Sequence, residues 1–216
     1  MDGSVYKRLF SSLILIPLTF FFIIKGSFFF LFFLFLCFVL SLKEWKNMSY
    51  EIRYFYPGVI FLLFSFISAF CLRILEDKGL IFFIYVLLIS IFSDLGGYVI
   101  GRLLKGPKLI KISPNKTYSG VLGAYIFSIL SIYFYLIILN KYFNQNEFFN
   151  IKTIILVLIV STISQIGDLI ISYFKRKFNI KDTGNLIPGH GGILDRIDGL
   201  IFALPFYYIL ILLNII

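Results

Sequence analysis

The chain has 216 residues, of which 60% are hydrophobic and only 14% are charged. Soluble domains contain roughly 45–50% apolar residues and do not carry repeated apolar runs of bilayer length. The composition therefore argues against a water-soluble globular fold and predicts an integral membrane protein. The formal net charge of +9 comes from Lys and Arg residues that gather between the apolar runs.

Seven apolar segments follow one another along the chain. Backbone groups in lipid must be satisfied internally, and the alternation typical of barrel strands is missing, so each segment is predicted to be a helix. They fall at about residues 9–24, 27–42, 58–75, 80–102, 119–139, 153–174 and 199–216. No small-residue cleavage site follows the first run, which is therefore interpreted as a retained helix. The predicted fold is an all-α, polytopic integral membrane bundle with about seven transmembrane helices, or eight if 80–102 breaks near Gly96-Gly97.

The distribution of Lys and Arg predicts how this bundle is oriented. If the N-terminus is cytoplasmic, the inside connections hold 15 of the 20 basic residues and the outside connections hold 5. Cytoplasmic connections generally carry this excess, so the sequence predicts an N-in, C-out topology. Two inside connections, 102–116 and 175–196, carry five basic residues each, which is more than attraction to anionic lipid requires.

Two aspartates, Asp94 and Asp168, lie inside apolar segments. Each is about eight residues, or roughly 12 Å, from the predicted cytoplasmic end of its helix. A carboxylate inside a span costs about 3 kcal/mol unless it is paired, hydrated or bound to an ion. It indicates either a structural pairing, with Arg102 or another polar neighbour, or a water-filled catalytic or transport cavity. A polar face favours the cavity, because on the helix of Asp168 polar residues recur at three- and four-residue steps: Ser161, Ser164, Gln165, Ser172 and Lys175.

The last helix is preceded by a glycine-rich connection, Gly189-His190-Gly191-Gly192, and opens with Asp195 and Asp198. Such a loop can present backbone N–H groups to a phosphate beside a helix N-terminus. His190 is either a base or a hydrogen-bonding loop residue, and Asp198 is also favourable there through the helix dipole alone.

The connection after the fourth segment is the other basic element. Lys116 stands just before the fifth segment, where a cation could neutralise a triphosphate. Pro107 and Pro114 exclude a continuous helix there. For Lys105, Lys108 and Lys111, the topology alone is a sufficient explanation.

The region from Asp168 to Asp198 resembles the signature of the phosphatidate cytidylyltransferase (CDP-diacylglycerol synthase) family. The matching residues are Ser172, Lys175-Arg176, Lys181-Asp182, Pro188-Gly189-His190-Gly191-Gly192 and Leu194-Asp195-Arg196-x-Asp198, with Asp94…Tyr98-x-x-Gly101-Arg102 and Ile112-Ser113-Pro114-x-Lys116-Thr117 upstream. The resemblance covers about residues 90–198, whereas the first 80 residues carry no motif. The family often has Glu at the positions of Ile171 and Ser119 and Ser at that of Gly199.

The resemblance implies a nucleotidyltransferase that converts CTP and phosphatidate to CDP-diacylglycerol and pyrophosphate with Mg²⁺. A second cation and a homodimer are left open, and no nucleic acid partner is expected. The implied catalytic residues are Asp168, Asp195, Lys175, Arg176 and Arg196. The implied substrate-binding residues are Asp94, Arg102, Ser113, Lys116, Ser172, Lys181, Asp182, Gly189, His190, Gly191, Gly192 and Asp198. The implied metal ligands are Asp94, Asp168 and Asp195.

The sequence is accordingly divided into motif-free transmembrane helices at 1–80 and a catalytic transmembrane domain at 81–216, whose signature loop spans 172–198. The expected location is a bacterial-type inner membrane, with the site on its cytoplasmic face. One alternative is a related CTP-dependent transferase that acts on another lipid phosphate or on an isoprenoid alcohol. The other is an ion-coupled transporter that uses Asp94 and Asp168 as relay carboxylates, although the internal repeat typical of such proteins is not seen.

Overall fold

The computed structural model describes residues 3–49, 51–75, 78–110, 113–143, 149–187 and 191–216. Its helices are α1 (Gly3–Lys25), α2 (Ser27–Met48), α3 (Ile52–Ile74), α4 (Gly79–Leu104), α5 (Tyr118–Phe143), α6 (Ile151–Lys177), α7 (Leu194–Ile197) and α8 (Leu200–Leu212). Its strands are β1 (Lys108–Ile110) and β2 (Ser113–Thr117).

The all-α membrane bundle is confirmed. Helices α2 to α6 are long and apolar enough to cross a membrane, and Leu13–Lys25 and Leu200–Leu212 are shorter apolar helices. Each of the seven predicted segments therefore corresponds to one helix. The alternative with eight spans is wrong, because α4 continues unbroken through Gly96 and Gly97. The predicted helices also extend further at several ends, where α2 reaches Met48 and α6 reaches Lys177.

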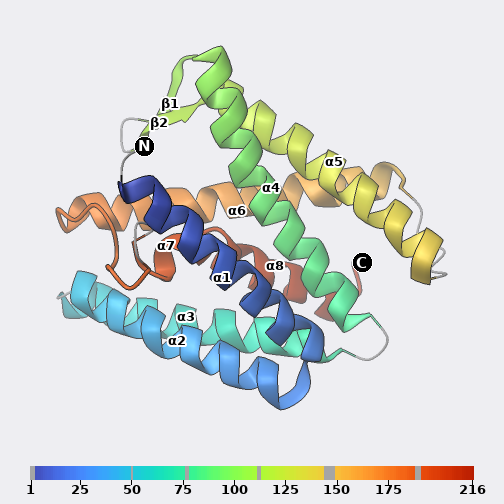
Figure 1. Ribbon diagram of the computed structural model, residues 1–216, viewed down its shortest axis with the longest axis horizontal. Coiled ribbons are helices and arrows are strands. Elements are labelled where there is room, and N and C mark those ends of the chain that lie inside the picture. The colour runs from blue at the N-terminus through green and yellow to red at the C-terminus, as the bar shows by residue number, and fades with distance from the viewer. Residues whose placement is uncertain (1–2, 50, 76–77, 111–112, 144–148, 188–190) are drawn as a thin grey trace.

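The helices run back and forth so that their connections gather at two ends of the molecule. In Figure 1 the β1–β2 hairpin, the junction of α2 and α3 and the connection after α6 lie toward the left and upper left. The junctions of α1 with α2 and of α3 with α4, and the C-terminus, lie toward the right. The connections predicted to share one side of a membrane therefore share one end of the bundle.

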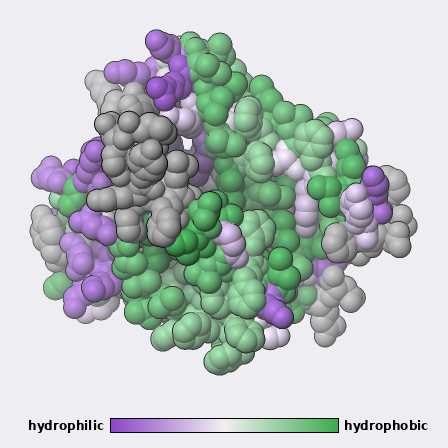
Figure 2. Space-filling model, viewed as in Figure 1, coloured by the Kyte–Doolittle hydropathy of each residue, from purple (hydrophilic) through white to green (hydrophobic). Residues whose placement is uncertain are grey.

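The surface between these two ends is apolar. Figure 2 shows hydrophilic residues mainly at the left and upper left and a smaller group at the right, with hydrophobic residues between them. Large apolar side chains from the middle of the helices, such as Phe35, Ile67 and Leu130, are exposed. Water would penalise such exposure, whereas a lipid bilayer is a favourable surrounding for it.

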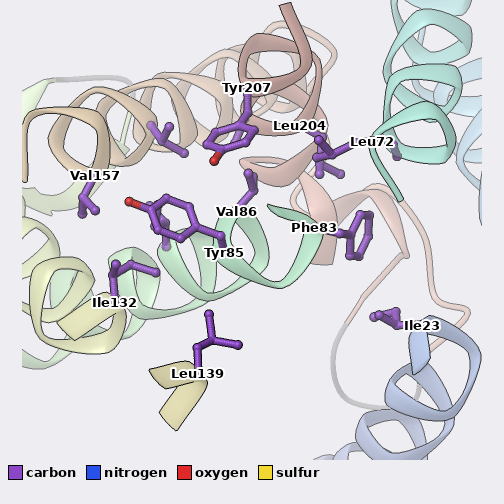
Figure 3. Packing of buried hydrophobic residues seen from close by; sticks show 14 of the residues in the cluster. Ile23, Leu72, Phe83, Tyr85, Val86, Ile132, Leu139, Val157, Leu204 and Tyr207 are labelled. Carbon is purple, nitrogen blue, oxygen red and sulfur yellow. The ribbon is translucent and has the colours of Figure 1, made fainter. Parts of the chain in front are cut away.

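Most of the interior is one cluster of buried apolar side chains, to which every long helix contributes. Figure 3 shows Tyr85 and Val86 of α4 facing Tyr207 of α8, near Ile132 of α5. The rings of Tyr85 and Tyr207 lie 5.8 Å apart between centroids. The cluster also includes residues from the first 80 positions, such as Leu72. The division at residue 80 stays a prediction, and both parts contribute to this one core.

A second cluster lies at the basic end of the bundle. It joins Trp45 and Met48 of α2 and Leu62 of α3 to Ile171 of α6 and to Leu194, which opens α7. Leu194 is fully buried, so it anchors the short helix α7 to the transmembrane helices. This anchoring matters for the site, since α7 carries Asp195.

Helices α4 and α5 form the most extensive helix pair, and glycines allow their close approach. A Cβ added at Gly96 would overlap the carbonyl oxygen of Gly123 on α5. At the next position, Gly97, an added Cβ would lie 3.6 Å from the carbonyl oxygen of Gly120, which is an ordinary contact. Small residues at such crossings let two backbones pack directly against one another.

Gly96→Ala is therefore expected to destabilise the protein by about 1–3 kcal/mol relative to Gly97→Ala, because overpacking forces the two helices apart. The matched substitution at Gly97 controls for the gain in helix propensity, which is the same at both positions. Unfolding in detergent, followed by heat or by denaturant, measures the difference. Equal stability of the two variants would contradict the proposed close packing.

Candidate active site

The basic connection after α4 folds into the β1–β2 hairpin, which the sequence did not predict. The strands pair antiparallel, with Lys108 opposite Thr117 and Ile110 opposite Ser113. The end of the hairpin is fixed to the start of α5, because the Gly120 N–H donates to Thr117 Oγ1 at 3.1 Å. This arrangement places Lys116, the penultimate residue of β2, against α6.

Lys116 forms an ion pair with Asp168. Its Nζ lies 2.5 Å from Asp168 Oδ2, and it also donates to the backbone carbonyl of Gln165 at 3.4 Å. The other carboxylate oxygen, Oδ1, accepts a hydrogen bond from Ser172 Oγ at 3.2 Å. The two charged side chains are only 26% and 25% exposed, so their pairing compensates charge at a half-buried position.

A cavity of about 270 Å³ opens beside this ion pair. It lies between α4, β2, α5 and α6, and its lining includes Asp94, Asp168, Lys116, Ser113 and Gln165. The two aspartates predicted from the apolar segments therefore face one cavity, as the cavity interpretation requires. The structure therefore shows both a cavity and a pairing, since Asp168 is paired with a polar neighbour, Lys116, and Arg102 donates instead to Tyr98 Oη at 2.8 Å.

The polar face of α6 continues from this cavity into the bundle. Ser161 Oγ lies 3.0 Å from Ser93 Oγ of α4, and it accepts hydrogen bonds from Ser128 of α5 and from Gln165. Buried hydroxyl groups in a membrane protein stabilise helix contacts when they are paired in this way. The polar face predicted for α6 therefore both holds α4, α5 and α6 together and carries Asp168.

A second charged cluster lies around Asp195, on α7. Lys175 Nζ lies 2.8 Å from Asp195 Oδ1. Asp195 Oδ2 accepts from the backbone N–H of Thr183 at 2.8 Å, from Thr183 Oγ1 at 3.0 Å and from the N–H of Gly192 at 3.0 Å. Burial alone would raise the pKa of Asp195, but the hydrogen bonds from Lys175 and from these backbone groups outweigh it and lower the pKa. Asp195 is accordingly ionised at neutral pH.

The face of α6 connects the two clusters. Asp168 and Lys175 are seven residues, or two helical turns, apart, which corresponds to roughly 10 Å along one face. Asp198 is buried near both, and its Oδ1 accepts the Gly199 N–H at 2.9 Å. Burial raises the pKa of Asp198, and the charges of Asp168 and Asp94 raise it further, whereas Lys175 lowers it. The site thus concentrates carboxylates at one end of the bundle.

The other predicted site residues differ in how closely they approach these clusters. Gly191 adopts a φ of +84° and pairs with Ile187 in an isolated β-bridge, so it forms the turn that brings Gly192 to Asp195. Exposed side chains at the same end of the molecule are Arg176, Lys181, Asp182 and Arg196. Gly189 and His190 lie outside the described residues.

The three departures from the family pattern have separate surroundings. Ile171 is buried in the apolar cluster with Trp45 and Leu194, away from the cavity lining. The hydroxyl of Ser119 accepts from the Gly106 N–H at 3.3 Å at the base of the hairpin. A Cβ added at Gly199 would overlap Ser164 Oγ, so the close contact between α6 and the start of α8 requires glycine here.

Glu44 of α2 was not predicted as a site residue from the sequence. This carboxylate is buried, with 4% of its surface exposed, and accepts hydrogen bonds from Thr183, Ile193 and Leu194 of the signature loop. The available signal was an acidic residue at the basic end of an apolar segment, flanked by Lys43 and Lys46. Such a residue is ordinarily solvated, so the sequence alone did not distinguish it.

The predicted metal ligands are not assembled into a closed protein site. In the described parts of the chain, no three His, Cys, Asp or Glu side chains lie close enough together to hold a metal ion. Both oxygens of Asp195 and both oxygens of Asp168 already have polar partners, and of the three aspartates Asp94 and Asp168 line the cavity. The metal assignments of Asp94, Asp168 and Asp195 stay predictions.

The sequence matches known cytidylyltransferases over most of its length. The model of the Cytidylyltransferase family covers residues 54–214. A phosphatidate cytidylyltransferase of Rickettsia felis is 35% identical over 220 residues, covering 97% of this chain and 93% of that protein. The Rickettsia typhi enzyme of the same name is 36% identical over 95% of this chain and 91% of its own length. One from Staphylococcus haemolyticus is 40% identical over 138 residues, covering 63% of this chain and 51% of that protein.

These matches include the cavity, both charged clusters and the helices that carry them. The resemblance seen in residues 90–198 is therefore confirmed and extends through most of the motif-free helices. The chain belongs to the cytidylyltransferase family.

Proposed function

We propose that this chain is a phosphatidate cytidylyltransferase, which transfers the cytidylyl group of CTP to phosphatidate and releases pyrophosphate. The observation that carries the proposal is the near full-length similarity to enzymes of that name, joined to a charged cavity at the end of a membrane-spanning bundle. A lipid substrate reaches such a site from the bilayer, and a nucleotide reaches it from water. Family membership argues against the ion-coupled transporter.

The reaction needs little covalent chemistry from the protein. An oxygen of the phosphatidate phosphate attacks the α-phosphorus of CTP, and the bond from that phosphorus to the bridging oxygen of the β-phosphate breaks, so pyrophosphate leaves. A phosphate monoester has a second pKa near 6, so the nucleophile is largely ionised at pH 7 and no strong base is required. The enzyme has to align two anions that repel each other and stabilise the charge of the transition state.

Lys116 and Lys175 are suited to this task. Each ammonium group is held in place by a carboxylate, Asp168 for Lys116 and Asp195 for Lys175. Positive charge that is fixed before the substrate arrives does not need to reorganise during the reaction, which is the main source of electrostatic catalysis. We assign Lys116 and Lys175 to the phosphate groups, and Asp168 and Asp195 to their orientation.

The carboxylates of the cavity also fit a magnesium ion. Mg²⁺ prefers oxygen ligands and is commonly held by one or two carboxylates, with waters and substrate phosphates completing its coordination. The buried Asp198 lies near Asp94 and Asp168, and these like charges favour a compensating cation. Asp94 and Asp168 would hold the ion. A bound Mg²⁺ supplies charge neutralisation on the phosphates. Asp195 fits ligation of this ion less well, because it is not among the residues that line the cavity shared by Asp94 and Asp168.

We also propose that the site lies on the cytoplasmic face of a bacterial cell membrane. The relatives are bacterial, and 15 of the 20 Lys and Arg residues lie in the segments predicted to be on the same side of the membrane as the cavity. CTP is a cytosolic nucleotide in this reaction, so the proposed orientation gives it direct access.

Purified protein with CTP labelled at the α-phosphate is expected to place the label in lipid when phosphatidate and Mg²⁺ are supplied. The label follows the α-phosphate because the bond that breaks lies beyond it. A panel of other lipid phosphates and an isoprenoid alcohol measures the alternative acceptors. Preferred labelling of another acceptor would overturn phosphatidate as the substrate.

The same assay tests the site residues. Asp168→Asn and Lys116→Gln should each lower turnover by about a hundredfold, the scale of losing one preorganised electrostatic group. Lys108→Gln, on the same hairpin but exposed, serves as the matched control and should retain normal turnover. Equal losses in Lys116→Gln and Lys108→Gln would show that bulk positive charge, rather than its placement, supports the reaction.

Cysteine labelling tests the orientation. In a background with Cys37→Ala and Cys71→Ala, a cysteine at the exposed Asn185 should resist an impermeant thiol reagent in intact cells and react after permeabilisation. A cysteine at the exposed Lys141, at the other end of the bundle, should react in intact cells. The reverse pattern would place the cavity on the side without CTP and contradict the proposal.

A further inference from the structure

Glu44 of α2 holds the signature loop from within the bundle. Its Oε1 accepts the Ile193 N–H at 2.8 Å, and its Oε2 accepts the Leu194 N–H at 2.8 Å and the Thr183 hydroxyl at 2.9 Å. Thr183 precedes the glycine-rich connection, Gly189 to Gly192, by six residues, and Leu194 follows it by two. One carboxylate from the motif-free part of the chain therefore fixes the signature loop on both sides of this connection.

The loop backbone is shaped to approach this carboxylate. A Cβ added at Gly184 would lie 3.0 Å from Glu44 Oε1, and one added at Gly192 would overlap Glu44 Oε2. Side chains at these two positions would push the loop away from α2. The two glycines are therefore explained by the proximity of Glu44.

Thr183 connects Glu44 to Asp195. Its hydroxyl oxygen lies 2.9 Å from Glu44 Oε2 and 3.0 Å from Asp195 Oδ2. A hydroxyl group has one proton, so it donates to one carboxylate at a time while its position is fixed by both. These contacts form a continuous chain from Glu44 through Thr183 to Asp195 and on to the ammonium group of Lys175.

A carboxylate is required at position 44 because three donors converge on it. Both oxygens of Glu44 are acceptors, whereas an amide offers one acceptor oxygen and an NH₂ group that would face another donor. Glu44 is also buried, so a donor left without an acceptor there cannot form a hydrogen bond to water instead. Leaving such a buried polar group unsatisfied costs free energy.

We propose that Glu44 is a positioning residue for cytidylyl transfer, which sets the placement of Asp195 and Lys175 through Thr183 and the start of α7. The inference rests on the proposed function, since it assigns Glu44 to the same site. Glu44 touches neither substrate in this account, and it acts only through the residues that it orients.

The test compares Glu44→Gln with Glu51→Gln, which makes the same change at an exposed position at the same end of the bundle. Glu44→Gln should lower kcat by roughly ten- to a hundredfold, the range seen when a hydrogen-bond partner that orients a working side chain is lost. KM for CTP and for phosphatidate should change by less than about threefold, because the substitution weakens stabilisation of the transition state and not the binding of the substrates. Glu51→Gln should match the wild type.

A double-mutant cycle separates positioning from mere stability. If Glu44 acts through Asp195, adding Glu44→Gln to Asp195→Asn should lower kcat by less than about twofold, since residues that act as one unit are not additive. Thermal unfolding in detergent identifies variants that are folded at the assay temperature. If Glu44→Gln does not fold, Thr183→Val serves as the test of the positioning role. This variant removes the shared hydroxyl group with little change of shape and should give the same loss of kcat.

Folded Glu44→Gln and Thr183→Val variants with kcat within about twofold of the wild type would overturn the inference, as would a full additional loss in the Asp195→Asn background. If the wild-type protein is active and the variants give either of these results, the role of Glu44 is overturned but the proposed function stands. A folded wild-type chain that transfers no cytidylyl group overturns the proposed function, and the inference falls with it.

Discussion

Charge at the edge of an apolar bundle has to be compensated, and the pairing of Lys116 with Asp168 is the interaction that meets this requirement here. The carboxylate lies within a membrane-spanning helix, and its cation comes from a hairpin outside the spans. Either group alone would be costly at a half-buried position. Together they fix the hairpin against α6 and leave Asp94 facing the same cavity.

The second pair, Lys175 with Asp195, repeats this logic two turns further along α6. Here the transmembrane helix supplies the cation, and the connection supplies the carboxylate. Apolar packing of Leu194 and the hydrogen bonds to Glu44 fix this connection to the transmembrane helices. The rigid helices therefore determine where the polar groups of two otherwise irregular segments lie, and a site that stabilises phosphate charge needs such placement.

The sequence predicted the helices because apolar runs of bilayer length have few alternatives in lipid. It also predicted Asp94 and Asp168, because carboxylates inside such runs are costly and therefore informative. The partner of Asp168 was not predictable, since the hairpin that delivers Lys116 depends on strand pairing within a short connection that has Pro107 before its first strand and Pro114 inside its second. Glu44 was missed for a related reason: its partners lie 139 to 150 residues away along the chain, and no local pattern marks the contact.

In the proposed mechanism, the cavity beside Lys116 and Asp168 receives the phosphates of CTP. A structure of the full chain with Mg²⁺ and an unreactive CTP analogue, in which a methylene group replaces the oxygen between the α- and β-phosphates, measures this directly. We expect the triphosphate to lie in the cavity and to contact Lys116, with Lys175 facing the α-phosphate. A nucleotide bound elsewhere, such as beside Arg53 and Tyr54 at the apolar groove between α3 and α6, with the cavity unchanged, would contradict it.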